Sequence, residues 1–84
     1  MDKYFICDYL AKGAGGQTLQ MYSMMTFAST MEMLLSIVKN LAGKYIVENG
    51  ASYVYCKIWQ WEYGEYKFFI DGYVNDGNPE EFSF

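Results

Sequence analysis

The segment that decides the predicted fold is residues 44–74, KYIVENGASYVYCKIWQWEYGEYKFFIDGYV. It contains two short turn signals, Asn49-Gly50 and Tyr63-Gly64, between runs rich in β-branched and aromatic residues. Asn-Gly between two such runs is typical of a type I′ β-hairpin, because both residues tolerate the positive φ angles of that turn. The segment therefore predicts three consecutive antiparallel strands, the first of them over residues 44–48.

Two more strands are predicted before this segment. Residues 3–10 are rich in aromatic and β-branched side chains, which favours a strand. Residues 17–27 alternate, with Ser23 and the apolar Leu19, Met21, Met25 and Phe27 on one face, and a period of two indicates an antiparallel strand. The glycine-rich residues 11–16 between them are interpreted as a hairpin connection. A phosphate-binding loop would need a helix directly after it.

A single helix is predicted between the two groups of strands. Ser29-Thr30-Met31-Glu32 matches a capping box, in which the serine hydroxyl and the glutamate satisfy free amide groups of the first turn. Gly43 then supplies a left-handed stop, so we expect a helix of about three turns. Its apolar stripe, at spacings of three and four residues, consists of Met31, Leu34, Leu35, Val38, Leu41 and Ala42.

The predicted element order is thus β-β-α-β-β-β, in one domain over residues 1–84. This order indicates an α+β fold, with a mostly antiparallel five-stranded sheet and one helix packed on one face. The strand order in the sheet stays open. Residues 75–84 form an acidic C-terminal tail, which we expect either to be mobile or to dock through Phe82 and Phe84.

Composition excludes several classes of partner. The chain has six lysines, no arginine, no histidine and ten acidic residues, giving a net charge of −4. Such a chain is repelled by nucleic acid and by anionic membrane surfaces. No apolar run of about 18 residues and no signal peptide are present, so we expect a cytoplasmic protein. In that compartment Cys7 and Cys56 stay as thiols, and both are interpreted as small buried apolar residues.

The residue inventory also argues against catalysis and metal binding. Without histidine, the chain lacks the commonest acid-base group, Cys-His and Ser-His pairs and most catalytic zinc sites. Asp71-Gly72 and residues 75–78 are rich in oxygen ligands but do not match a calcium-binding loop, and turn formation explains them better. We therefore expect no enzyme, no cofactor and no metal site.

The aromatic residues of the 44–74 segment are the main functional lead. With two-residue turns at both signals, one face carries Tyr53, Tyr55, Lys57, Trp59 and Trp61 with Ile46, Tyr66, Phe68 and Ile70. The other face carries Tyr45, Val47, Val54, Cys56, Ile58, Phe69 and Tyr73 with four polar residues. One helix covers only one face. Either the aromatic rings widen the core, or some of them form an exposed patch. A β-bulge in one of the strands would shift the register by one residue and move its side chains to the opposite faces.

An exposed patch of tyrosine and tryptophan is typical of protein interfaces. The leading hypothesis is a non-enzymatic inhibitor that binds a protein with a basic surface, such as a nucleic-acid-handling effector. The alternatives are a structural protein that forms homodimers or larger homo-oligomers, and a sugar-binding module that stacks rings on its ligand. The candidate partner-binding residues are Tyr53, Tyr55, Trp59, Trp61, Glu62, Glu65, Tyr66, Asp71, Glu80 and Glu81.

In size, acidity, lack of catalytic groups and predicted α+β build, the chain resembles the small phage-encoded inhibitors of bacterial defence systems, among them the anti-CRISPR proteins. The resemblance covers the whole chain and is one of class, because this group shares no motif. It implies a stoichiometric inhibitor that docks on a CRISPR effector and blocks target DNA binding or cleavage in the cytoplasm of the host cell.

Overall fold

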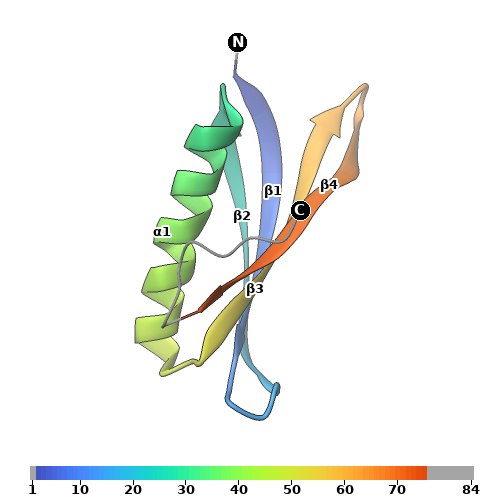
Figure 1. Cartoon of the computed structure of the whole chain (residues 1–84). Helices are drawn as coiled ribbons and strands as arrows, with labels where there is room; N and C mark the ends of the chain where they lie inside the picture. The colour runs from blue at the N-terminus through green and yellow to red at the C-terminus, as the bar shows by residue number, and fades with distance from the viewer. Residues whose placement is uncertain (1, 76–84) are drawn as a thin grey trace.

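A computed structural model describes residues 2–75 and consists of one sheet and one helix (Figure 1). The elements in chain order are β1 (Lys3–Lys12), β2 (Thr18–Ala28), α1 (Met31–Asn49), β3 (Tyr53–Glu62) and β4 (Glu65–Asn75). All neighbouring strands are antiparallel, and the order across the sheet is β2-β1-β3-β4. The helix lies along one face of the sheet, and no helix or strand of residues 2–75 lies over the other face.

Two hairpins build the sheet, and both follow local turn signals. The β1–β2 connection is closed by hydrogen bonds from Gly13 N to Gln17 O and from Gly16 N to Gly13 O, both 2.9 Å. In the β3–β4 turn, Tyr63 and Gly64 have φ angles of 50° and 85°. Positive φ at both central residues is what a type I′ turn requires. The predicted second turn is therefore present.

The prediction of a strand over residues 44–48 is wrong, because these residues form the last part of α1. The helix has 19 residues and runs through Gly43, so it makes about five turns rather than three. Ala42, Tyr45 and Ile46 continue the helical spacing of buried positions. Burial of these side chains against the sheet outweighs the penalty of about 1 kcal/mol for a glycine inside a helix.

The two helix caps also differ from the prediction. The N-cap is Thr30, not Ser29, and its hydroxyl accepts a 3.1 Å hydrogen bond from the Met33 amide. At the other end Gly50 is left-handed, with φ 59°, and its N–H bonds to the carbonyls of Ile46 and Val47. Asn49-Gly50 is therefore a helix end and not a hairpin turn. Both structures use glycine at positive φ, so the dipeptide fits either.

The described residues consequently contain a four-stranded sheet, and the prediction of a fifth strand is wrong. The α+β class, the antiparallel pairing and the single helix on one face are confirmed. Residues 76–84, which include most of the predicted acidic tail, lie outside the described residues.

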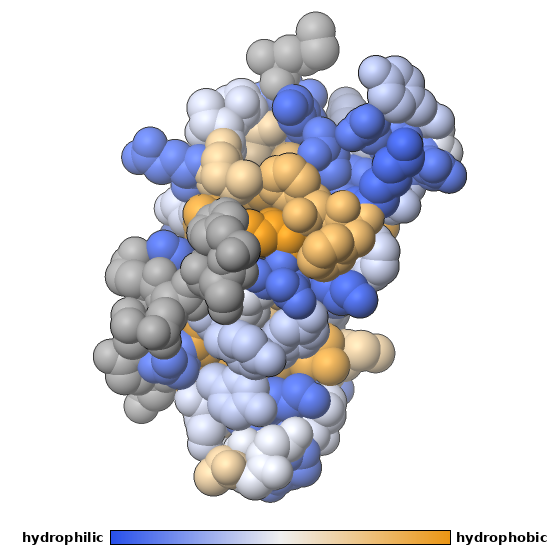
Figure 2. Space-filling model, turned by 45° about the vertical axis from the view of Figure 1, so that its right-hand side comes forward, coloured by the Kyte–Doolittle hydropathy of each residue, from blue (hydrophilic) through white to orange (hydrophobic). Residues whose placement is uncertain are grey.

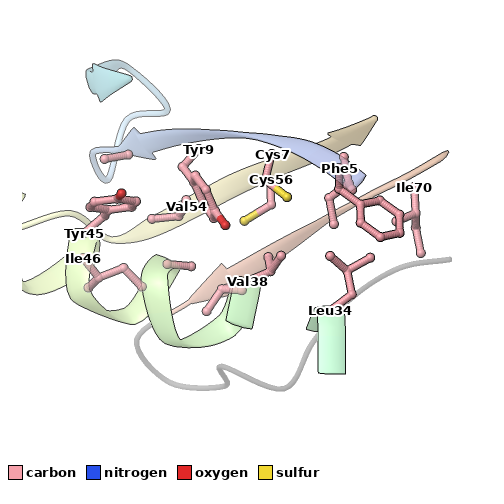
Figure 3. Packing of buried hydrophobic residues seen from close by; sticks show 14 of the residues in the cluster. Phe5, Cys7, Tyr9, Leu34, Val38, Tyr45, Ile46, Val54, Cys56 and Ile70 are labelled. Atoms are coloured by element: carbon pink, nitrogen blue, oxygen red, sulfur yellow. The ribbon is translucent and has the colours of Figure 1, made fainter. Parts of the chain in front are cut away.

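The core lies between α1 and the face of the sheet that it covers, named here the covered face. From the sheet, Cys7, Tyr9 and Cys56 point toward the helix, and Leu34 and Val38 of α1 point toward the sheet (Figure 3). All five are fully buried. The ring of Tyr45 stacks on Tyr22 of β2 at 3.7 Å and meets Tyr9 edge-on at 5.3 Å. The buried residues of the covered face are Phe5, Cys7, Tyr9, Ala11, Thr26, Ala28, Val54, Cys56, Ile58, Ile70, Gly72 and Val74.

Candidate functional site

The opposite side of the sheet, named here the open face, has no helix over it among the described residues. Strand registers place its side chains, because residues paired across antiparallel strands point to the same side. The open face consists of Tyr4, Ile6, Asp8 and Leu10 of β1, Met21, Ser23, Met25 and Phe27 of β2, Tyr53, Tyr55, Lys57, Trp59 and Trp61 of β3, and Tyr66, Phe68, Asp71 and Tyr73 of β4.

Apolar side chains on this face remain accessible to water. Phe27 is 53% exposed, Phe68 52%, Tyr4 49% and Tyr73 47%. A space-filling view shows hydrophobic surface near the middle of the molecule, next to strongly hydrophilic side chains (Figure 2). Contiguous exposed apolar surface on a small protein is a mark of an interaction site.

A bulge in β4 determines which of its side chains reach the open face. Ile58 pairs with Ile70 and the next residue, Trp59, pairs with Phe68, so Phe69 has no partner in the register. The extra residue exchanges the faces beyond it. Ile70, predicted beside the tryptophans, is therefore buried on the covered face, while Tyr73, predicted on the other side, lies on the open face.

A polar row crosses the middle of the open face, with one residue from each strand. Asp8 of β1 lies opposite Ser23 of β2 and opposite Lys57 of β3, and Lys57 lies opposite Asp71 of β4. Asp8 accepts hydrogen bonds from Ser23 Oγ at 2.9 Å and from Trp59 Nε1 at 3.3 Å. The carboxylate thus fixes the orientation of the Trp59 indole.

The lysine of this row lies against aromatic rings. Lys57 Nζ is 4.9 Å from the centroid of the Trp59 ring and 5.7 Å from that of Phe68. These distances are within the range of cation–π attraction. The rings of the open face are therefore arranged so that they stabilise a positive charge.

Asp71 is held by a tyrosine of the neighbouring strand. Tyr55 Oη donates a 2.5 Å hydrogen bond to Asp71 Oδ2. This hydrogen bond, with a smaller contribution from burial, raises the pKa of the Tyr55 hydroxyl to about 12. The phenol is consequently neutral at physiological pH and keeps the carboxylate in place.

A shallow pocket lies to one side of the polar row. It has a volume of about 250 Å³ and is lined by one side chain from each strand, Tyr4, Met25, Trp61 and Tyr66. The Trp61 and Tyr66 rings meet edge-on with centroids 4.9 Å apart. The pocket presents three aromatic rings and a thioether, so it suits an apolar side chain or a cation of a binding partner.

The structure brings six of the predicted partner-binding residues together on the open face. These are Tyr53, Tyr55, Trp59, Trp61, Tyr66 and Asp71. Glu62 and Glu65 pair next to the β3–β4 turn, and strand alternation turns both to the opposite side of the hairpin. Glu80 and Glu81 lie outside the described residues.

Sequence reasoning missed the contributions of β1 and β2. Tyr4, Met25 and Phe27 belong to the open face, and Tyr4 meets Phe27 edge-on at 5.0 Å. The alternation in residues 17–27 already placed Met25 and Phe27 on one side of their strand. Only the strand order was needed to join that side to the aromatic residues of β3.

The two thiols are part of the core and not of the open face. Cys7 and Cys56 are both free and fully buried. Burial raises the pKa of both thiols, that of Cys56 to about 12. Because the thiolate is the reactive form, neither sulfur is an available nucleophile at neutral pH.

Within residues 2–75, no cluster of three or more His, Cys, Asp or Glu side chains has the arrangement of a metal site. In the same part of the chain, no helix combines the length and the apolar character needed to cross a membrane. Comparison with protein-family models, with curated proteins and with solved structures finds no match.

Proposed function

We propose that this protein binds another protein through the open face and acts as a non-enzymatic inhibitor. The observation that carries the proposal is the unequal cover of the sheet. The helix buries one face, whereas the other leaves tyrosine, tryptophan and phenylalanine side chains of four strands at the surface. Tyrosine and tryptophan are the residues that dominate binding energy at protein interfaces.

A partner with a basic surface fits this face best. The chain has a net charge of −4. The open face itself holds Asp8 and Asp71, and its aromatic rings already receive the ammonium group of Lys57. An arginine or lysine of a partner that enters the pocket between Tyr4 and Trp61 would lie among three aromatic rings, whose faces attract a cation. Charge attraction would also speed association.

Such binding inhibits a partner whose basic surface normally holds nucleic acid, because the acidic protein occupies the phosphate-binding positions. A CRISPR effector in the host cytoplasm is the specific partner that the class resemblance implies. The resulting inhibition is stoichiometric, because each inhibitor molecule binds and blocks one effector.

The proposal is tested with matched alanine variants. Trp61→Ala removes a wall of the pocket, and Val47→Ala changes an 82% exposed side chain of α1 as the control. Each protein is titrated into purified CRISPR effectors, and target-DNA cleavage and direct binding are measured at low and high ionic strength. We expect inhibition by the wild type and by Val47→Ala. Trp61→Ala should weaken binding by about 2 kcal/mol, the size of an interface hot spot.

Separate outcomes count against separate parts of the proposal. If Trp61→Ala and the wild type bind the effector equally well, the open face is not the contact surface. Capture of basic proteins other than CRISPR effectors, with the same loss for Trp61→Ala, would retain the binding function and reject the CRISPR-specific target. Retardation on immobilised glycans, with no protein partner, would reject the proposal in favour of a sugar-binding module.

A further inference from the structure

The two edges of the sheet differ in how well they are protected against pairing with another strand. β4 carries Glu65, Lys67 and Asp71 and is interrupted by the bulge at Phe69. Charges and bulges are the usual devices that stop an edge strand from pairing. β2 is 11 residues long and contains no charged residue, and its register with β1 is regular from Gln20 to Ala28.

β2 also exposes large apolar side chains on both of its faces. On the open face, Met21 is 65% exposed and Met25 is 59% exposed. On the side of the helix, Met24 is 42% exposed. A partner lying on the open face alone leaves Met24 in water. Only a chain that approaches the sheet edge-on covers both sides of the strand.

The backbone of β2 also directs hydrogen-bonding groups outward, toward a chain that approaches this edge of the sheet. The Met21 N–H donates to the side-chain oxygen of Gln20 at 3.2 Å, so it points away from β1. Successive residues of a strand direct their N–H groups alternately, and the N–H groups of Ser23 and Met25 therefore point outward as well. Among the described residues, β2 pairs only with β1, so this row faces solvent.

We propose that β2 pairs antiparallel with β2 of a second copy across a two-fold axis at Ser23, which joins the two sheets into one. Met21 then lies opposite Met25 of the second copy, and the outward N–H and C=O groups bond to each other. A two-fold interface brings the same patch of both copies together. This proposal concerns the edge of the sheet and does not rest on the function proposed for the open face, although the two surfaces share Met21, Ser23 and Met25.

A second copy fits this edge better than the basic partner does. Two chains that each carry a net charge of −4 repel each other, and a strand without charges is where they approach with the least repulsion. A basic partner, in turn, finds no carboxylate on β2 to meet its lysines and arginines. The apolar side chains and outward backbone groups of β2 instead match the same groups on β2 of a second copy.

A cysteine placed on the proposed axis gives a direct test. In the Ser23→Cys variant, residue 23 of the two copies would lie about 5.5 Å apart between Cα atoms, which a disulfide spans. The native thiols are buried and do not compete. We expect mild oxidation to convert Ser23→Cys to a covalent dimer, and to leave Val47→Cys, a solvent-exposed control on α1, monomeric under denaturing electrophoresis.

Sedimentation of the unmodified protein supplies the second test, because Ser23→Cys also loses the hydrogen bond to Asp8. We expect a monomer–dimer equilibrium that Met24→Lys, on the helix side of β2, weakens at least tenfold and Val47→Lys leaves unchanged. A wild-type protein that stays monomeric at about 1 mM overturns the proposal. So does a dimer that is lost in Trp61→Ala but kept in Met24→Lys, since the copies would then meet through their open faces.

Discussion

The two faces of the sheet are built from alternate residues of the same four strands, yet they differ in side-chain size. Toward the helix, Cys7, Ala11 and Cys56 are small and fully buried. On the other side, Tyr4 and Trp61 are large and nearly half exposed. Small side chains let the helix backbone approach the sheet closely, and close packing then stabilises the core. In this sheet, which is apolar on both faces, the small residues thus mark where the helix packs, and the large Phe5 and Tyr9 fill the core beside them.

The largest expected difference between the two faces is in the cost of truncation. Leu34→Ala removes a fully buried side chain that packs on the covered face, and should lower the free energy of unfolding by about 2–5 kcal/mol. Phe68→Ala, at a 52% exposed position, should lower it by less than about 1.5 kcal/mol. Urea denaturation of both variants measures the difference. Equal losses would mean that the open face is buried in the isolated protein.

Alkaline pH should destabilise the protein through groups of the covered face. Burial raises the pKa of Cys56 from 9.0 to about 12 and raises those of Cys7 and Tyr9. Above pH 9.0 the unfolded chain loses the Cys56 proton, whereas the folded protein retains it up to pH of about 12. The folded state then binds more protons, so stability falls as pH rises through this window.

The measurement is the melting temperature as a function of pH under reducing conditions, with Cys56→Ala as the comparison. We expect the melting temperature of the wild type to fall more steeply than that of Cys56→Ala between pH 9.0 and about 12. Parallel curves for the two proteins would show that the buried thiol does not contribute to the loss.

Two tyrosine hydroxyls give a smaller contrast of opposite sign. Tyr9 Oη is buried on the covered face beside the weakly hydrogen-bonding Cys7 thiol and has no nitrogen or oxygen partner, so Tyr9→Phe should stabilise the protein by about 1 kcal/mol. On the open face Tyr55 Oη donates to Asp71, so Tyr55→Phe should destabilise it by about 1 kcal/mol. The melting temperatures of both variants, compared with that of the wild type, test these two opposite changes in stability. A loss of stability in Tyr9→Phe would show that its hydroxyl finds a partner in solution.

The smallest expected effect concerns the helix that distinguishes the two faces. A Cβ atom added at Gly43 meets nothing within 4 Å. Because residue 43 is inside α1, Gly43→Ala should stabilise the protein by about 0.5–1 kcal/mol. If the helix ended at residue 43 in a left-handed conformation, the same substitution would destabilise it. The sign of the change, from urea denaturation, therefore tests the length of the helix.

Local signals in the sequence were sufficient for the two hairpins and the start of the helix. Tyr63-Gly64 and the glycine-rich residues 11–16 connect the predicted strands, and the helix begins within a residue or two of the predicted cap. The end of the helix was not predictable in this way. Asn49-Gly50 serves a hairpin and a helix end equally well, and the choice depends on Tyr45, whose ring packs on Tyr9 and Tyr22 from distant strands.

The sequence predicted the part of the candidate site in which the β3–β4 turn fixes the pairing register of the two strands. Trp59, Trp61 and Tyr66 share one face because the turn has two residues. The bulge at Phe69 has no signal in the sequence, and it reverses the predicted positions of Ile70 and Tyr73. The part of the face from β1 and β2 depends on strand order, which pairing between distant segments decides.

The strand order has a consequence for folding kinetics. Each hairpin closes between neighbouring segments, but the β1–β3 pairing, from Phe5 with Gln60 to Lys12 with Tyr53, joins segments that are separated by β2 and the whole of α1. Closing so long a loop costs entropy before its contacts form, so we expect this central pairing to limit the folding rate. Substitutions along it, such as Ile58→Val, should slow folding, whereas changes at the β3–β4 turn should mainly speed unfolding.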